Sequence, residues 1–370
     1  MGARRKVFGG KQKNSEYPIG LDVGDGGIRL MQLALRGGQL TAVAAAHVRL
    51  PGESRSDGDA YHAEVTRAMG RALAAGGFTG HAVVSSLPAS SLQCKNLRLP
   101  VMPADELASA VQWEAADRFG FGDRQTSAQF FVAGQVRQGE EERQEIILLA
   151  ARLGFVERHV SSLTENNLRP KAIDAAPAAL ARLSGTWDDA SEVHVTIDFG
   201  RSATKVLIVK AGKVVFYKPI DIGAAQLDST VSGSLGISLD EARQRRENLD
   251  SAALKDRRDF ASTLQPVVGD LGREIGLCLR YYGVTFRGPR PETGRLIGGA
   301  ADKDLAESLG QASGLKLTLD GVLDGIDLSA VRETIKPGTE RAWAVAAGLS
   351  LREHTRPKSA AAQTTNGAAA

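Results

Sequence analysis

Cysteine is scarce in this chain, and its histidines do not cluster. The two cysteines, Cys94 and Cys278, lie far apart and form no C-x-x-C pair, which excludes a disulfide framework and a cysteine-based zinc site. The six histidines stand singly, and no two are four residues apart, as a helical metal-chelating pair would be. We therefore expect no bound transition metal and a reducing compartment.

Aromatic residues, an excess of one charge and long apolar runs are missing as well. Aromatics make up 5% of the chain, and 46 basic residues stand against 43 acidic ones, for a net charge of +3. A general nucleic-acid binder would instead show a basic excess and stacking aromatics. No apolar run approaches the length of a membrane span, and no apolar segment follows the charged N-terminus as in a signal peptide. The chain is predicted to bind no nucleic acid and to stay in the cytoplasm.

Two stretches repeat one pattern, in a chain of 370 residues that exceeds the usual size of a single core. IGLDVGDGGIRL (19–30) and VTIDFGRSATKVLI (195–208) each combine an apolar run, an Asp-x-Gly corner, small residues and a second apolar run. Each predicts a strand, a tight glycine turn and a second strand, whose N–H groups form an anion site suited to phosphate. The predicted contacts are Asp22, Gly24, Gly26 and Gly27 in the first stretch, and Asp198, Gly200, Ser202, Thr204 and Lys205 in the second.

The two aspartates of these stretches point to a metal. A carboxylate does not sit on phosphate unless a cation such as Mg²⁺, or its waters, lies between them. We therefore expect Asp22 and Asp198 to face a magnesium-bound nucleotide from opposite sides, holding Mg²⁺ through water. A single Asp-x-Gly is also what an ordinary hairpin turn contains. Two copies, near the starts of the two halves of the chain, favour the phosphate interpretation.

A third motif lies near the end of the chain. Residues 295–301, RLIGGAA, form an apolar strand that ends in Gly298 and Gly299. Without side chains, these glycines leave room for a flat base or a ribose on the backbone. A helix-entry turn is the alternative interpretation.

The order of these motifs, followed by the apolar stretch AWAVAAGLSL (342–351), resembles the superfamily of actin, Hsp70 and the sugar kinases. Within it, residues 18–352 are most similar to the PilM family of bacterial type IV pilus assembly, which is related to the division protein FtsA. The resemblance implies a two-lobed α/β fold, the duplicated ribonuclease H-like fold of actin-like ATPases, with an FtsA-type inserted subdomain. The stretches that carry it are 86–121, 145–182, 236–248 and 274–283.

The expected domain organisation follows from this resemblance. A disordered basic leader (1–17) precedes a first lobe (18–97), which residues 173–192 and 334–352 complete. An inserted strand and helix subdomain (98–172) interrupts that lobe. The second lobe (193–333) contains a smaller subdomain at 223–289, and a disordered tail (353–370) ends the chain. The alternative interpretation is that the basic leader contacts an anionic membrane surface. Myristoylation is not expected, because Lys6 stands where that motif has Ser or Thr.

The resemblance also implies ATP and Mg²⁺ as cofactors, with departures at several positions. Arg246 stands where the family usually carries a lysine near the adenosine, and Arg243 replaces an acidic residue there. Asp25, Gly26 and Gly27 occupy positions where the family favours hydroxyl side chains. The sequence identifies no residue that would position an attacking water. Asp174, the nearest candidate for a base that would activate a sugar hydroxyl, is interpreted as a helix N-cap. The chain is therefore expected to be at most a weak ATPase.

The partner implied by the resemblance is the cytoplasmic N-terminal segment of a PilN-like bitopic inner-membrane protein. It would bind in a groove between the first lobe and the inserted subdomain and link the pilus motor ATPases to the periplasmic complex. The chain would then be peripheral at the inner membrane. Two alternatives stay open: a nucleotide-free adaptor of a type II secretion-like system, and a small-molecule kinase of the same superfamily.

Overall fold

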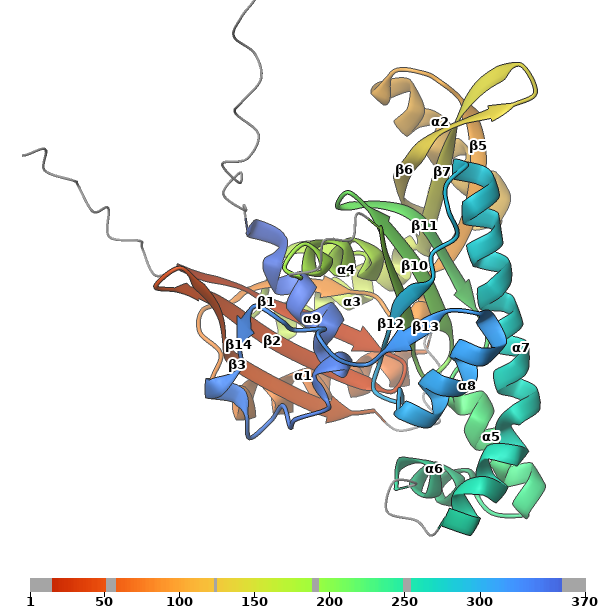
Figure 1. Cartoon of the computed structure of the whole chain (residues 1–370). Coiled ribbons are helices and arrows are strands. Elements are labelled where there is room, and N and C mark those ends of the chain that lie inside the picture. Colours follow the sequence, from red (N-terminus) through yellow and green to blue (C-terminus); the bar gives the residue numbers. More distant parts are fainter. Residues whose placement is uncertain (1–14, 51–57, 123–124, 188–192, 249–253, 355–370) are drawn as a thin grey trace, which may run out of the picture.

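The computed structural model describes residues 15–50, 58–122, 125–187, 193–248 and 254–354, arranged around three β-sheets (Figure 1). The predicted leader and tail therefore lie mostly outside the described residues. At the two ends the predicted bounds need correction, because residues 15–17 belong to the first strand and Glu353 ends a 3₁₀ turn. The Tyr17 hydroxyl lies 2.7 Å from Nδ1 of His354, so the ends of the described chain meet.

A six-stranded sheet forms the first lobe. Its strands alternate apolar side chains between two helix-covered faces, as a fully covered sheet requires. Ile19, Leu21 and Val23 pack under α1 (Asp59–Gly76) and α3 (Leu153–Glu165), while the opposite face carries α4 (Ala176–Ser184) and α9 (Ala344–Ser350). The strand order is β14 (Ile326–Asp327), β3 (Gln39–Arg49), β2 (Gly27–Arg36), β1 (Ser15–Gly24), β4 (Ala82–Ser86) and β8 (Arg169–Asp174).

A five-stranded sheet forms the second lobe, and its central hairpin repeats the β1–β2 hairpin of the first. The strand order is β11 (Lys213–Ile220), β10 (Thr204–Lys210), β9 (Val193–Phe199), β12 (Thr293–Ile297) and β13 (Lys316–Thr318). Apolar residues of this sheet share a core with the helices that surround it. These helices are α5 (Ala224–Leu235), α6 (Leu239–Glu247), α7 (Leu254–Phe286) and α8 (Lys303–Ser313).

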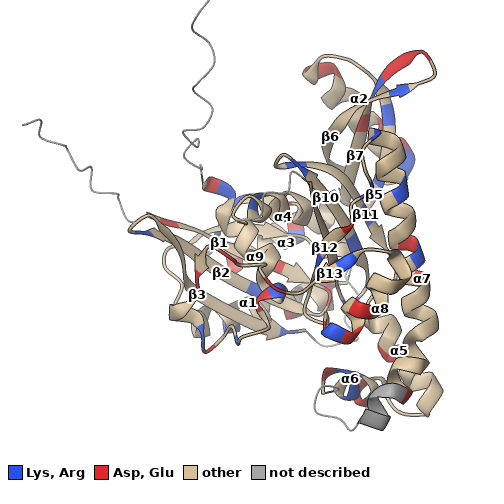
Figure 2. Ribbon diagram, in the orientation of Figure 1, with Lys and Arg blue, Asp and Glu red and all other residues tan. Residues whose placement is uncertain are grey.

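An inserted module with its own small core interrupts the sequence of the first lobe. It consists of β5 (Gln93–Pro100), α2 (Ala104–Phe119), β6 (Thr126–Gln138) and β7 (Glu141–Arg152), in the sheet order β5-β7-β6. The module borders the second lobe, where β6 lies beside β11. The buried carboxylate of Glu145 accepts hydrogen bonds from Arg98, at 2.8 Å, and from the Tyr281 hydroxyl on α7. The tip of the β6–β7 hairpin is acidic (Figure 2).

The predicted limits of this subdomain, 98–172, need correction. The sheet begins at Gln93, and the residues after Arg152 belong to the first lobe: α3 packs against α1, and β8 pairs with β4. The second lobe also ends earlier than the predicted residue 333, because β14 pairs with β3 of the first lobe. Helix packing and strand pairing between distant segments determine these boundaries.

Helix α9 lies directly on the backbone of its neighbours. A Cβ atom on Gly20 of β1 would lie 2.0 Å from the carbonyl oxygen of Ala346, and one on Gly348 would lie 2.1 Å from that of Ala179 on α4. Only glycine permits these contacts. In the described residues, no helix combines the length and apolarity needed to cross a membrane.

Under the first sheet, His159 of α3 is buried beside β4. Its Nε2 lies 2.9 Å from the hydroxyl of Ser85, and 1% of the residue is exposed. Burial, with the neighbouring His62, lowers the pKa of His159 from 6.5 to about 4. The folded protein therefore keeps this imidazole neutral.

We expect His159 to make the protein less stable in weak acid. The stability that depends on the neutral imidazole of His159 is fully present above pH 6.5. It is lost as the pH falls toward 4, because only the unfolded chain takes up the proton in that range. The loss amounts to about 3 kcal/mol. Urea unfolding from pH 7 to pH 4 should show a flatter pH dependence for His159→Gln than for the wild type. His81→Gln, at an exposed position, is the control, and parallel curves for wild type and His159→Gln would contradict the assignment.

Candidate functional site

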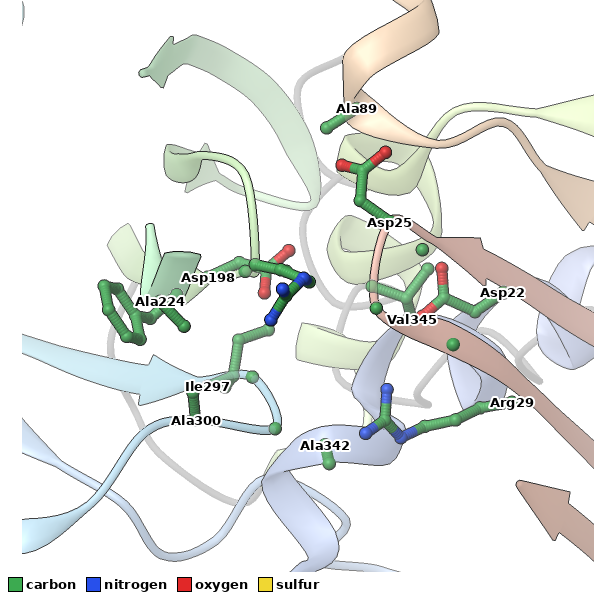
Figure 3. A pocket seen from close by; sticks show the side chains of 18 of the residues that line it. Asp22, Asp25, Arg29, Ala89, Asp198, Ala224, Ile297, Ala300, Ala342 and Val345 are labelled. Carbon is green, nitrogen blue, oxygen red and sulfur yellow. The ribbon is translucent and has the colours of Figure 1, made fainter. Parts of the chain in front are cut away.

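A cleft lies where the loops of the two central hairpins face each other. Four segments line it: the β1–β2 loop, the β9–β10 loop, the turn after β12, and the region around the start of α9. Helix α6 adds side chains at one side. Figure 3 shows Asp22 and Asp25 on the first loop opposite Asp198 on the second, with Ile297 and Ala300 beside the turn. The cleft therefore brings together the three predicted motifs.

Asp22 occupies the end of β1, at the floor of the first loop. Ser86 of β4 donates a hydrogen bond of 3.1 Å to its carboxylate. Burial raises the pKa of Asp22, and the charge of Arg29, which lies directly opposite in the β1–β2 register, acts in the other direction. Asp198 on the facing loop raises the pKa further. The two predicted carboxylates thus lie close enough to repel each other.

Asp198 is paired with a lysine of its own hairpin. Nζ of Lys205 donates a 2.9 Å hydrogen bond to Oδ2 of Asp198. Burial alone would lower the pKa of Lys205, but the charge and hydrogen bond of Asp198, with the charges of Asp22 and Asp25, outweigh it and raise the pKa. A Cβ atom on Gly200 would lie 2.8 Å from this Nζ and 2.8 Å from the carbonyl oxygen of Ala203. The backbone contact means that the second loop needs glycine at this position.

The tip of the first loop is hydrogen-bonded to the second loop across the cleft. The carboxylate of Asp25 accepts hydrogen bonds from Ser90, just after β4, and from Ser202 on the second loop. Ser202 thus lies at the predicted loop, with its hydroxyl already engaged. Thr204 does not face the cleft, because it is buried and donates a 2.6 Å hydrogen bond to the carbonyl of Ile222.

The backbone of the turn after β12 lies against the backbone at the end of β9. Gly298 has φ of +109°, and a Cβ atom there would lie 2.2 Å from the carbonyl oxygen of Phe199. A Cβ on Gly299 would lie 2.7 Å from Nη2 of Arg29, so this arginine reaches across the cleft to the turn. Both predicted glycines line the cleft. The two glycines contribute no side chains to this surface, as the sequence predicts, and the Arg29 guanidinium occupies the space over Gly299.

Arg246 lines the cleft but is held by a carboxylate that the sequence analysis does not identify. Its Nε donates a 2.7 Å hydrogen bond to Asp228 on α5, and the two side chains are 8% and 3% exposed. On the same helix, Glu247 accepts hydrogen bonds of 3.0 Å from Arg243 and from Arg49 at the end of β3. The Arg49 contact is a second bond between the lobes.

Asp174 is not the N-cap of α4. It is the last residue of β8; its carboxylate accepts a hydrogen bond from the Ala175 N–H and pairs with Arg182 at 2.6 Å and with Arg352 at 2.8 Å. Two arginines therefore neutralise a carboxylate that a kinase would need as a base.

Cations outnumber carboxylates in the described lining of the cleft. Most of these cations were not predicted from the sequence. The position of Arg29 opposite Asp22 could have been predicted by counting back along both strands from the two-residue turn between Gly24 and Gly27. The lining contains seven basic residues, Arg29, Arg49, Arg201, Lys205, Arg243, Arg246 and Arg341, and four acidic ones, Asp22, Asp25, Asp198 and Glu247. Such a cleft is suited to a polyanion.

The predicted magnesium ligands do not fit a metal as their side chains lie. Asp198 is paired with Lys205, and Asp22 is opposite Arg29. Within the part of the chain that the structure describes, no three His, Cys, Asp or Glu side chains are placed to hold a metal ion together.

Comparison with known proteins identifies relatives over nearly the whole chain. The family model described as "Type IV pilus assembly protein PilM" matches residues 20–354. A solved "PilM-PilN type IV pilus biogenesis complex" contains a chain with 21% identity and a TM-score of 0.75, and the match covers 91% of this chain and 98% of that one. The ethanolamine utilization protein EutJ from Carboxydothermus hydrogenoformans matches with 13% identity and a TM-score of 0.54, over 92% of this chain and 91% of that one. The predicted fold, a two-lobed α/β actin-like ATPase fold with an inserted subdomain, is confirmed.

We expect the pair of Arg246 and Asp228 to matter for stability. Arg246→Leu should lower the free energy of unfolding by about 3–5 kcal/mol, because it leaves a buried carboxylate without its main partner. The double substitution Arg246→Leu and Asp228→Leu should be less destabilising, since it removes the buried carboxylate together with Arg246, and Arg201, the other partner of Asp228 at 3.5 Å, is 22% exposed. Urea unfolding of the single and double variants measures both effects. A change within about 0.5 kcal/mol for Arg246→Leu, as at an exposed site, would contradict this account.

Proposed function

The chain belongs to the PilM family of type IV pilus assembly proteins, and from this membership we propose that it is a nucleotide-binding scaffold of a type IV pilus. The family match over residues 20–354 is the observation that carries the proposal. The cleft supports it, because the paired loops and the side-chain-free turn lie together as a nucleotide site requires. We place the protein in the cytoplasm, peripheral at the inner membrane.

The proposed ligand is ATP. Its phosphates would lie between the two glycine-containing loops, whose N–H groups and surrounding cations favour negative charge. Its base or ribose would lie against Gly298, and Gly299 would leave room for the Arg29 guanidinium beside the phosphates. We assign no catalytic step, because the described carboxylates of the cleft are engaged by serines, Lys205 or arginines. Figure 2 shows Lys and Arg interspersed with Asp and Glu over the described elements, in agreement with the balanced charge of the chain.

The proposed partner is the cytoplasmic N-terminal segment of a PilN-like bitopic inner-membrane protein. The solved relative is described as a PilM-PilN complex, and this chain carries the first lobe and the inserted module between which we place the segment. Through this partner the scaffold would connect pilus motor ATPases with the periplasmic part of the machine. We propose that nucleotide adjusts the closure of the lobes, which requires different affinities for two states.

We expect ATP to stabilise the purified protein against heat. A ligand at 100 times its dissociation constant adds about 2.7 kcal/mol to the free energy of unfolding. Ala300→Trp, which fills the cleft beside the turn, should abolish the shift, whereas Gln311→Trp, at an exposed position of α8, should keep it. Absence of a shift in the wild type, with partner binding intact, would instead favour the nucleotide-free adaptor. ADP production that depends on a small-molecule substrate would favour the kinase.

We expect the N-terminal segment of the PilN-like protein to be necessary and sufficient for complex formation. The full-length partner should be captured from membranes by the tagged chain, and a partner without this segment should not. Amine crosslinking of a synthetic segment should modify Lys95 of the inserted module or Lys171 of the first lobe, and should spare Lys303 and Lys316 of the second lobe; all four lysines are exposed. Crosslinks at the last two alone would place the site elsewhere, and no capture would contradict the proposed partner.

A further inference from the structure

Each Asp-x-Gly loop carries a cation directly opposite its aspartate. Asp22 is in register with Arg29 across β1 and β2, and Asp198 is in register with Lys205 across β9 and β10. Side chains directly opposite in an antiparallel pair stand on the same face of the sheet and interact. The two lobes therefore repeat an aspartate in register with a cation as well as a glycine turn, and in the second lobe the two side chains form an ion pair.

The pair in the second lobe is closed and little exposed. Lys205 Nζ lies 2.9 Å from Oδ2 of Asp198, and their side chains are 15% and 10% exposed. The same Nζ lies over Gly200, where a Cβ atom would be 2.8 Å away. The ammonium group thus stands beside the carboxylate and the glycine loop, where a metal ion would have to stand.

Arg29 has the corresponding position in the first lobe. Its guanidinium extends from β2 along Asp22 to the turn after β12, where Gly299 leaves it room (Figure 3). The two other carboxylates of the described lining are engaged as well: Asp25 by Ser90 and Ser202, and Glu247 by two arginines. The described lining therefore has an excess of positive charge, with seven basic residues against four acidic ones.

We infer that this cleft binds its nucleotide as the free polyphosphate anion, with Lys205 and Arg29 in the place of a magnesium ion. Phosphate oxygens would accept hydrogen bonds from these two cations, of which Lys205 is hydrogen-bonded to Asp198 in the absence of a ligand. Magnesium would have to displace Lys205 from Asp198 and add positive charge to a cleft that already has an excess. The inference rests on the proposed function, since it concerns the same nucleotide.

Calorimetric titration of the full chain with ATP, in excess EDTA and in excess Mg²⁺, tests this inference. ATP should bind in EDTA at least as tightly as in Mg²⁺. Lys205→Ala should weaken binding in EDTA by about tenfold or more, the effect of losing one charged hydrogen bond. Lys210→Ala is the matched control, because Lys210 is exposed at the far end of the same strand.

Asp198→Asn gives a second test that does not remove the lysine. The amide keeps the size of the side chain and removes one negative charge facing the phosphates. The inference predicts unchanged or tighter ATP binding, whereas an aspartate that organises Mg²⁺ would make this variant lose binding. Wild-type binding that requires Mg²⁺, together with loss of binding in Asp198→Asn, would overturn the inference and leave the proposed nucleotide site standing. Absence of ATP binding in both buffers would contradict the nucleotide site itself.

Discussion

The direct packing of α9 on the backbone of β1 fixes the position of the cleft. Glycine at positions 20 and 348 lets this helix approach β1 and α4 without intervening side chains. Ser350 strengthens the contact, because its hydroxyl donates to the carbonyl of Pro18 at 2.7 Å and accepts from the Leu33 N–H at 3.1 Å. Residues near the start of α9, among them Ala342 and Val345, line the cleft. The last helix of the first lobe therefore holds the first loop and one cleft wall in one rigid unit.

Electrostatics then determine what the cleft can hold. Two lobes each present an aspartate in register with a cation of the same hairpin, and arginines from β3 and α6 add charge around them. Because carboxylates in such a site repel each other at short distance, their partners are needed in the folded state even without a ligand. The bonds of Asp25 with Ser202 and of Glu247 with Arg49 join the lobes across the cleft. A ligand that enters must compete with these contacts.

Local patterns predicted much of this structure. The hairpin loops and the glycine turn depend on neighbouring residues, and the structure contains them. The limits of the inserted module could not be predicted in this way, because α3 is assigned to the first lobe only by its packing on α1. Arg246 was expected beside the adenosine, but its partner Asp228 lies on another helix, 18 residues away in sequence. The orientation of the Thr204 hydroxyl likewise depends on a distant residue, because it donates to the carbonyl of Ile222, which lies beyond the next strand.

Helix α7 connects parts of the molecule that are expected to have separate roles. It has 33 residues, which corresponds to about 50 Å, and it runs from the α5 and α6 region beside the cleft to the inserted module (Figure 1). Near the module, Tyr281 of α7 is bonded to Glu145, while Pro266 lies within the helix. In a rigid helix of this length, a small rotation of the α5–α6 region about the cleft displaces the far end of the helix by several ångströms. A displacement of the module would reach the cleft along the same path.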